Sequence, residues 1–141
     1  MKLAAVAIIA FTLTWAFIGL ANGQTTSRIE IASSLVSVRE SEDVRTDILL
    51  LWNREVRTRP IGHAVVSCFE IHAGGIAGDG FENCTAYYQL PLGKITAAGE
   101  IHARNHYTLV ITGGSGAYKG AAGHLFTLRV GPGLKRVTFN L

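Results

Sequence analysis

The sequence predicts an all-β domain that folds as an eight-stranded antiparallel up-and-down β-barrel. Residues 24–141 contain about eight short runs rich in Val, Ile, Leu, Tyr, Phe and Thr, and Gly, Pro, Asn and Asp separate these runs. No segment of this part has a long apolar stripe at helical period. Consecutive antiparallel strands with short connections favour a barrel, because closure leaves no exposed sheet edge.

The expected strands follow one another along the whole domain. They are residues 28–39, 44–53, 61–72, 81–90, 94–102, 107–112, 123–130 and 135–140. Polar and apolar residues alternate most clearly in 28–31 and 94–98, as expected for strands with one buried face. Residues 48–52 are apolar throughout and fit a buried strand or the start of a short helix, of which the strand is preferred. Pro91-Leu92-Gly93 and Gly131-Pro132-Gly133 supply turn residues for two hairpins.

The first 23 residues are expected to be a secretory signal peptide. Lys2 gives a positive charge, residues 3–20 carry none, and the small residues Ala21-Asn22-Gly23 follow. Cleavage is expected after Gly23, with cleavage after Ala21 as the second choice. The alternative is an uncleaved membrane anchor, since about 20 apolar residues can cross a bilayer. We therefore expect a secreted protein, extracellular or periplasmic, with one domain over residues 24–141.

The charge pattern argues against nucleic acid as a partner. The net charge is +3, and acidic and basic residues are interspersed. A nucleic-acid binder would cluster Lys and Arg on one face, but the sequence has only the small group Arg54, Arg57 and Arg59. No motif indicates a cofactor, and the ligand spacing of a zinc site is absent from the sequence. Neither a cofactor nor a metal is expected.

Cys68 and Cys84 are the two cysteines of the sequence. An even cysteine count in an oxidising compartment indicates a disulfide, and C-x-x-C spacing, typical of a reactive or metal-binding pair, is absent. The glycine-rich segment 73–80 separates the two strands, and both cysteines lie equally far from Ile76. In a hairpin they would therefore face each other. Asn83-Cys84-Thr85 is also a sequon, so Asn83 is a glycosylation candidate if the host modifies such sites.

Residues 111–123, Ile-Thr-Gly-Gly-Ser-Gly-Ala-Tyr-Lys-Gly-Ala-Ala-Gly, form the most distinctive segment. Glycine permits positive φ and close backbone approach, and Tyr118 could cover the loop. A phosphate-binding loop is the alternative, but the Lys-Ser/Thr ending is missing and a strand follows instead of a helix. We interpret the segment as a structural glycine loop, made of Gly113, Gly114, Gly116, Tyr118, Gly120 and Gly123.

The same segment closely resembles the G-G-T-G-x-(Y/F)-x-G-A-x-G signature of the allene oxide cyclase and dirigent-like barrels. Ile61-Gly62-His63 leading to Cys68, and Cys84 leading through residues 90–96 to Gly99, agree with that family in order and spacing. The resemblance runs from about residue 46 to 141. It implies an antiparallel barrel, often assembled as a homotrimer. Allene oxide cyclases isomerise an unstable fatty-acid epoxide, and dirigent proteins orient phenoxy radicals, but the resemblance places no catalytic residue on this sequence.

Two repeated tripeptides provide the candidate catalytic residues. Glu70-Ile71-His72 and Glu100-Ile101-His102 lie on the third and fifth expected strands, which both finish at one end of a barrel. Glu and His two positions apart share a face of a strand, so the pairs could converge on a proton-transfer or metal site. Strands separated by a third lie roughly 10 Å apart, however, and polar residues at strand ends are usually solvated. Tyr87 and Tyr88 are ligand-binding candidates, because one of the two rings should line the interior.

Three functions follow from an eight-stranded barrel, whose interior is either filled or wide enough for one small ligand. The first is a barrel that binds or shapes an apolar small molecule, with no membrane contact except through an uncleaved signal segment. The second is a cyclase-like isomerase acting on a lipid-derived or similar reactive guest. The third is a structural or interaction protein with a filled barrel.

Overall fold

The computed structural model describes residues 27–41, 44–71, 81–102 and 104–141. The expected signal peptide over residues 1–23 and the candidate His72 lie outside these residues. The described chain forms eight strands. They are β1 (Arg28–Ser41), β2 (Val44–Asn53), β3 (Pro60–Ile71), β4 (Phe81–Leu90), β5 (Gly93–Ile101), β6 (His106–Gly116), β7 (Gly123–Gly131) and β8 (Leu134–Asn140).

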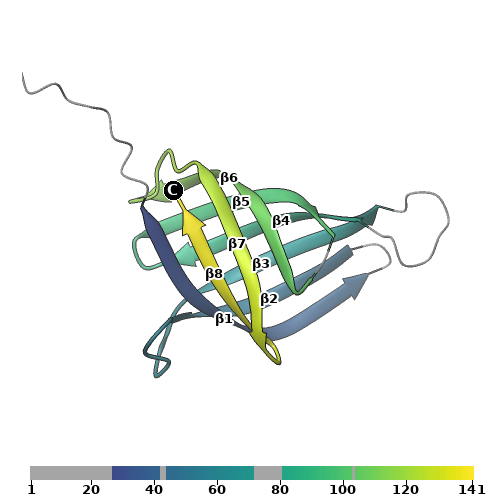
Figure 1. The fold of residues 1–141 in the computed structure, drawn as a ribbon, viewed down its shortest axis with the longest axis horizontal. Coiled ribbons are helices and arrows are strands. Elements are labelled where there is room, and N and C mark those ends of the chain that lie inside the picture. Colours follow the sequence, from purple (N-terminus) through teal and green to yellow (C-terminus); the bar gives the residue numbers. More distant parts are fainter. Residues whose placement is uncertain (1–26, 42–43, 72–80, 103) are drawn as a thin grey trace, which may run out of the picture.

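Each strand pairs antiparallel with the next, and β8 closes onto β1, so the sheet is a closed eight-stranded barrel (Figure 1). The predicted fold class is confirmed. Residues 48–52 lie in a strand, as preferred from the sequence. Within the described residues, no helix has the length and hydropathy of a membrane span.

The glycine segment differs from its prediction as a loop. Gly113, Gly114 and Gly116 belong to β6, and Gly123 begins β7, so only residues 117–122 connect the two strands. Gly114 and Gly116 pair with Ile95 and Gly93 of β5. A Cβ at Gly114 would overlap the carbonyl oxygen of Tyr118. The glycines therefore let the connection of residues 117–122 pack closely against the end of β6.

One end of the barrel is packed solid, and the chain termini of the described part lie there. The ring of Tyr88 meets that of Phe139 edge to face, with centroids 5.1 Å apart. Further apolar side chains of the inner face fill the space around these rings, among them Leu51, Ile95, Ile111, Leu125 and Val137. Ala64 pairs with Tyr88 across β3 and β4, and its small side chain leaves room for the large ring.

Cys68 and Cys84 form a disulfide between β3 and β4. The two residues are directly paired across the strands, with Cα atoms 4.1 Å apart, as the spacing around Ile76 predicted. A bridge closing a loop of this size contributes about 2–4 kcal/mol to stability. It lies toward the end of the barrel opposite the Tyr88–Phe139 pair.

Candidate functional site

The end of the barrel opposite Tyr88 and Phe139 holds a cavity of about 310 Å³. Alternate residues of each strand point inward, so the rows of buried side chains continue toward this end. Along β2 the inward row runs from Leu51 and Leu49 to Asp47 and Arg45, and along β8 it runs from Phe139 and Val137 to Lys135. The interior therefore changes from apolar to charged along the barrel axis.

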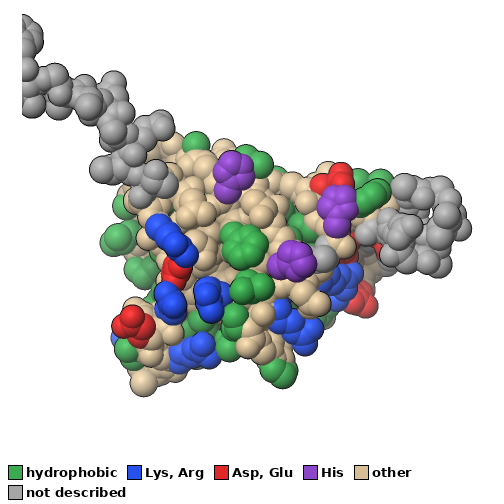
Figure 2. Space-filling view, in the orientation of Figure 1, with side chains coloured by type: hydrophobic (Ala, Val, Ile, Leu, Met, Phe, Trp, Pro, Cys, Tyr) green, Lys and Arg blue, Asp and Glu red, His purple; other side chains and the backbone are tan. Residues whose placement is uncertain are grey.

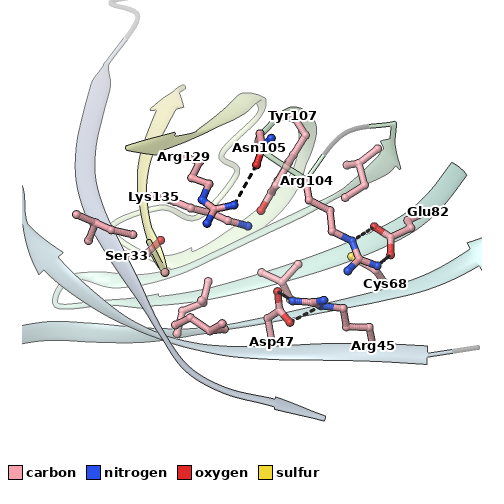
Figure 3. A pocket seen from close by; sticks show the side chains of 16 residues that line it. Ser33, Arg45, Asp47, Cys68, Glu82, Arg104, Asn105, Tyr107, Arg129 and Lys135 are labelled. Atoms are coloured by element: carbon pink, nitrogen blue, oxygen red, sulfur yellow. Dashed lines mark hydrogen bonds and ion pairs between the residues drawn. The ribbon is translucent and has the colours of Figure 1, made fainter. Parts of the chain in front are cut away.

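The walls of the cavity combine apolar and charged side chains. The apolar part comes from Leu35, Leu49, Val66, Ile101, Tyr107 and Leu134, and the charged part from Arg45, Asp47, Glu82, Arg104, Arg129 and Lys135. Figure 3 shows the charged side chains reaching into the cavity from strands around the barrel and, for Arg104, from the connection between β5 and β6. A volume of this size falls at the lower end of the range for small-molecule pockets, about 300–1,000 Å³.

Both carboxylates in the cavity wall are bonded to arginine. Arg45 Nε donates to Asp47 Oδ1 at 2.8 Å on β2. Arg104 donates to Glu82 through two nitrogens, with Nε 3.0 Å from Oε2. Hydrogen bonding to Glu82 raises the pKa of Arg104, so its guanidinium stays charged. The two pairs form one side of the cavity mouth (Figure 3).

Lys135 is half-buried on the other side, with Nζ 5.2 Å from the centroid of the Tyr107 ring. Burial lowers the pKa of Lys135, and the nearby charges of Arg45, Arg104 and Arg129 lower it further against the opposing effect of Asp47. Arg129 donates to the side-chain oxygen of Asn105 and to the carbonyl oxygen of Gly131, both at 3.4 Å.

Three buried hydroxyls of the interior, Ser33 Oγ, Tyr88 Oη and Thr127 Oγ1, have no hydrogen-bond partner within the described chain. Ser33 is 1% exposed and lines the cavity. Burial raises the pKa of the Tyr88 and Tyr107 phenols, so both stay protonated at neutral pH. The hydroxyl of Thr127 lies near both phenols and lowers their pKa in part, although it forms no hydrogen bond of normal geometry with either.

Comparison with known proteins places this architecture in a family. The model of the allene oxide cyclase barrel-like domain matches residues 40–138. The chain belongs to this family. No curated protein matches the chain significantly. Among solved structures, a chain described as pyocyanin demethylase is similar with a TM-score of 0.65 and 18% sequence identity, over 79% of this chain and 97% of that chain. At this identity the similarity shows the fold alone.

In this allene oxide cyclase barrel-like domain, the two Glu–His tripeptides are not brought together in the described part. Glu70 continues the inward row of β3 and lines a smaller hollow of about 220 Å³ at the rim. Glu100 lies on the outward row of β5, exposed, with His102 Nε2 3.0 Å from its Oε1. The described residues hold no group of three or more His, Cys, Asp or Glu side chains arranged for a metal.

The tyrosine candidates lie on opposite faces of β4, as the alternation predicted. Tyr88 is fully buried in the packed half of the barrel and does not line the cavity. Tyr87 faces outward, and Lys94 Nζ lies 5.5 Å from its ring centroid. Asn83, the sequon residue, is exposed on the outer face of the same strand. Histidine side chains also lie apart from one another on the outer surface (Figure 2).

The charged residues of the cavity were missed by sequence reasoning, which weighed repeated motifs and aromatic rings instead. A signal for them exists in the alternation of each strand. Asp47 follows the spacing of Leu49 and Leu51, and Lys135 follows that of Val137 and Phe139. A charge at an inward position close to a strand end is costly unless it is paired or meets water or a ligand, and this cost marks such residues as candidates.

Proposed function

We propose that this allene oxide cyclase barrel-like protein binds a small molecule with an apolar body in the open half of its barrel. The single observation that carries the proposal is the uneven filling of the interior. One half is closed by Tyr88 and Phe139, whereas the other holds a cavity of about 310 Å³ whose wall includes Val66, Ile101 and Tyr107. A filled structural barrel would have no such space.

Two further findings support the proposal. The similar solved structure carries the name pyocyanin demethylase, which describes action on a small organic molecule by a chain of this fold. The Cys68–Cys84 disulfide is consistent with a protein that functions in an oxidising compartment, such as the extracellular space or the periplasm, because disulfides persist there.

A neutral aromatic probe tests the proposal, and Leu35 and Val36 offer a matched pair of variants on β1. Leu35 lines the cavity, whereas Val36 is more exposed and does not line it. We expect methyl 2-naphthoate to bind the wild-type protein in equilibrium dialysis, and Leu35→Trp to weaken binding by about tenfold because the indole fills the mouth. Val36→Trp should leave binding unchanged. Equal binding by both variants, with circular dichroism showing folded protein, would place the guest elsewhere and reject the proposal.

An isomerase acting in the same cavity is the second candidate. Burial lowers the pKa of Lys135 toward neutral pH. This favours the second candidate, since a general acid or base works best when its pKa lies near the working pH. Native mass spectrometry of protein made in an oxidising compartment would identify a co-purified guest. An isomerase leaves the mass of that guest unchanged and alters its chromatographic retention, whereas a binding protein alters neither.

A further inference from the structure

The cavity wall has an uneven charge distribution. Each of its two carboxylates forms an ion pair with one arginine of the wall, in the pairs Arg45–Asp47 and Arg104–Glu82. Arg129 and Lys135 form no ion pair with any carboxylate of the described residues. Within the described cavity wall, Arg129 and Lys135 are therefore two positive charges without an ion-pair partner, whereas Glu40 and Glu70 lie at the adjoining rim with Arg45 and Arg104.

Arg129 and Lys135 are directly paired across β7 and β8. Like charges opposite each other on neighbouring strands destabilise a sheet, and both side chains line the same cavity. Figure 3 shows them next to each other and apart from the two ion pairs. The contact of Lys135 with the Tyr107 ring offsets part of its desolvation, but a ring face satisfies none of the directional hydrogen bonds that an ammonium donates.

Ser33 provides a second and independent observation. It pairs with Lys135 across β1 and β8, lines the cavity, and is 1% exposed. Its hydroxyl has no partner among the described residues. A buried donor without a partner costs about 1–3 kcal/mol. Two cations and an unused hydroxyl donor thus line one side of the cavity on three consecutive strands of the closed barrel, β7, β8 and β1.

We propose that Arg129, Lys135 and Ser33 form an anion subsite that receives the carboxylate, or a similar oxyanion, of an organic acid whose apolar body fills the cavity. This inference rests on the proposed function and adds the chemical class of the guest. An oxyanion accepts the hydrogen bonds that these three side chains can donate, and charge-assisted bonds of this kind are the stronger ones. Its negative charge also removes the repulsion between β7 and β8.

A matched pair of probes separates this inference from the proposed function. 2-Naphthoate and its methyl ester share one ring system, and only the acid carries a charge. We expect the wild-type protein to bind 2-naphthoate more tightly than the ester. Lys135→Gln should weaken binding of the acid by about tenfold, as expected for one charge-assisted hydrogen bond, and should leave binding of the ester unchanged. Arg129→Gln should act in the same direction.

Lys94→Gln is the control variant, because Lys94 also lies over a tyrosine ring but on the outer wall, at 5.5 Å from the centroid of Tyr87. It removes the same net charge without touching the cavity, so it should change neither affinity. Ser33→Ala should weaken binding of the acid alone, by a smaller factor than Lys135→Gln.

The pH dependence supplies another readout. Raising the pH through the lowered pKa of Lys135 removes its charge, so affinity for 2-naphthoate should fall while affinity for the ester stays constant. The other charged or titratable groups facing this region are Arg45, Asp47, Glu82, Arg104, Tyr107 and Arg129. Burial raises the pKa of Tyr107, so its phenol titrates above its ordinary range. Lys135→Gln should abolish the fall.

The outcomes distinguish the two proposals. Binding of the ester but no preference for the acid, or equal loss of acid binding in Lys135→Gln and Lys94→Gln, would reject the anion subsite and leave the binding barrel standing. Binding of neither probe would reject both. Displacement of 2-naphthoate by an equal concentration of inorganic phosphate would assign the subsite to a free inorganic anion and overturn the organic acid.

Discussion

Tyr88 is the residue that closes one half of the interior. Its ring is fully buried and packs edge to face on Phe139, but its hydroxyl has no partner within the described chain. The ring stabilises the fold through its apolar area, whereas the hydroxyl has lost its hydration without a bond in return. The benefit of this side chain therefore comes from its carbon atoms.

Replacing Tyr88 by Phe should raise the free energy of unfolding by about 1 kcal/mol, because the change removes an unsatisfied buried hydroxyl and keeps the ring. Urea denaturation measures this difference. Tyr107→Phe is the control, since the Tyr107 ring lines the cavity, where its hydroxyl has access to water or a guest. A lower stability of Tyr88→Phe would show that the hydroxyl is hydrogen-bonded through a buried water.

At the scale of the strands, local patterns carried most of the prediction. Cys68 and Cys84 were placed opposite each other by counting from Ile76, and β2 and β4 have the bounds expected from the sequence. The sixth strand was predicted too short, as 107–112, because its glycines were assigned to a loop. Glycine weakens a strand in general. Gly114 and Gly116 belong to β6 because they pair with β5, and a local sequence pattern does not reveal this pairing.

Gly123 marks the point where the connection after β6 enters β7. Its φ is +135°, and a Cβ there would overlap the carbonyl oxygen of Asn140 on β8. Gly120, in the same connection, has a φ of +78° with open space around the position of a Cβ. Both glycines thus relieve backbone strain, but only Gly123 also allows the backbones of β7 and β8 to come together.

Gly120→Ala should lower the free energy of unfolding by about 1–2 kcal/mol, the cost of a left-handed conformation. Gly123→Ala should lower it more, because the added methyl group also pushes β8 away from β7. Thermal unfolding of the two variants compares these costs. An equal loss in both would mean that the contact with Asn140 relaxes freely and that strain alone requires the glycine.

At the scale of the whole molecule, the barrel has a packed half and an open half. Leu125 and Phe139 lie in the packed half, and Arg129 and Lys135 lie further along the same two strands at the cavity. Local opening is easiest where few apolar contacts hold the chain. The backbone amide of Arg129 donates to the carbonyl oxygen of Asn105, which belongs to a connection between strands.

Amide hydrogen exchange should therefore follow the barrel axis. We expect the amides of Leu125 and Phe139 to exchange only through global unfolding, and those of Arg129 and Lys135 to exchange at least about tenfold faster through local opening. Exchange followed by NMR compares positions on the same strand, so differences between strands cancel. Uniform protection along β7 and β8 would show that the two halves open together.

The candidate site could be predicted only in part, since its chemistry depends on which end of the barrel stays open. The alternation along β8 places Lys135 on the same face as Phe139, but the sequence does not tell that Phe139 meets Tyr88 at one end while Lys135 meets Arg129 at the other. Glu100 and His102 repeat the spacing of an earlier tripeptide, yet Glu100 lies on the outward row of β5 and His102, just after the strand, is exposed beside it.

The separation of packed and open halves also has a consequence for descent with modification. Side chains around Tyr88 and Phe139 carry the stability of the barrel, so selection on folding acts mainly there. Substitutions around the cavity mouth change the recognised molecule with little effect on the scaffold, because that end contributes less apolar packing. Related chains can thus diverge in specificity while they keep the same fold, and no intermediate sequence needs to be unstable.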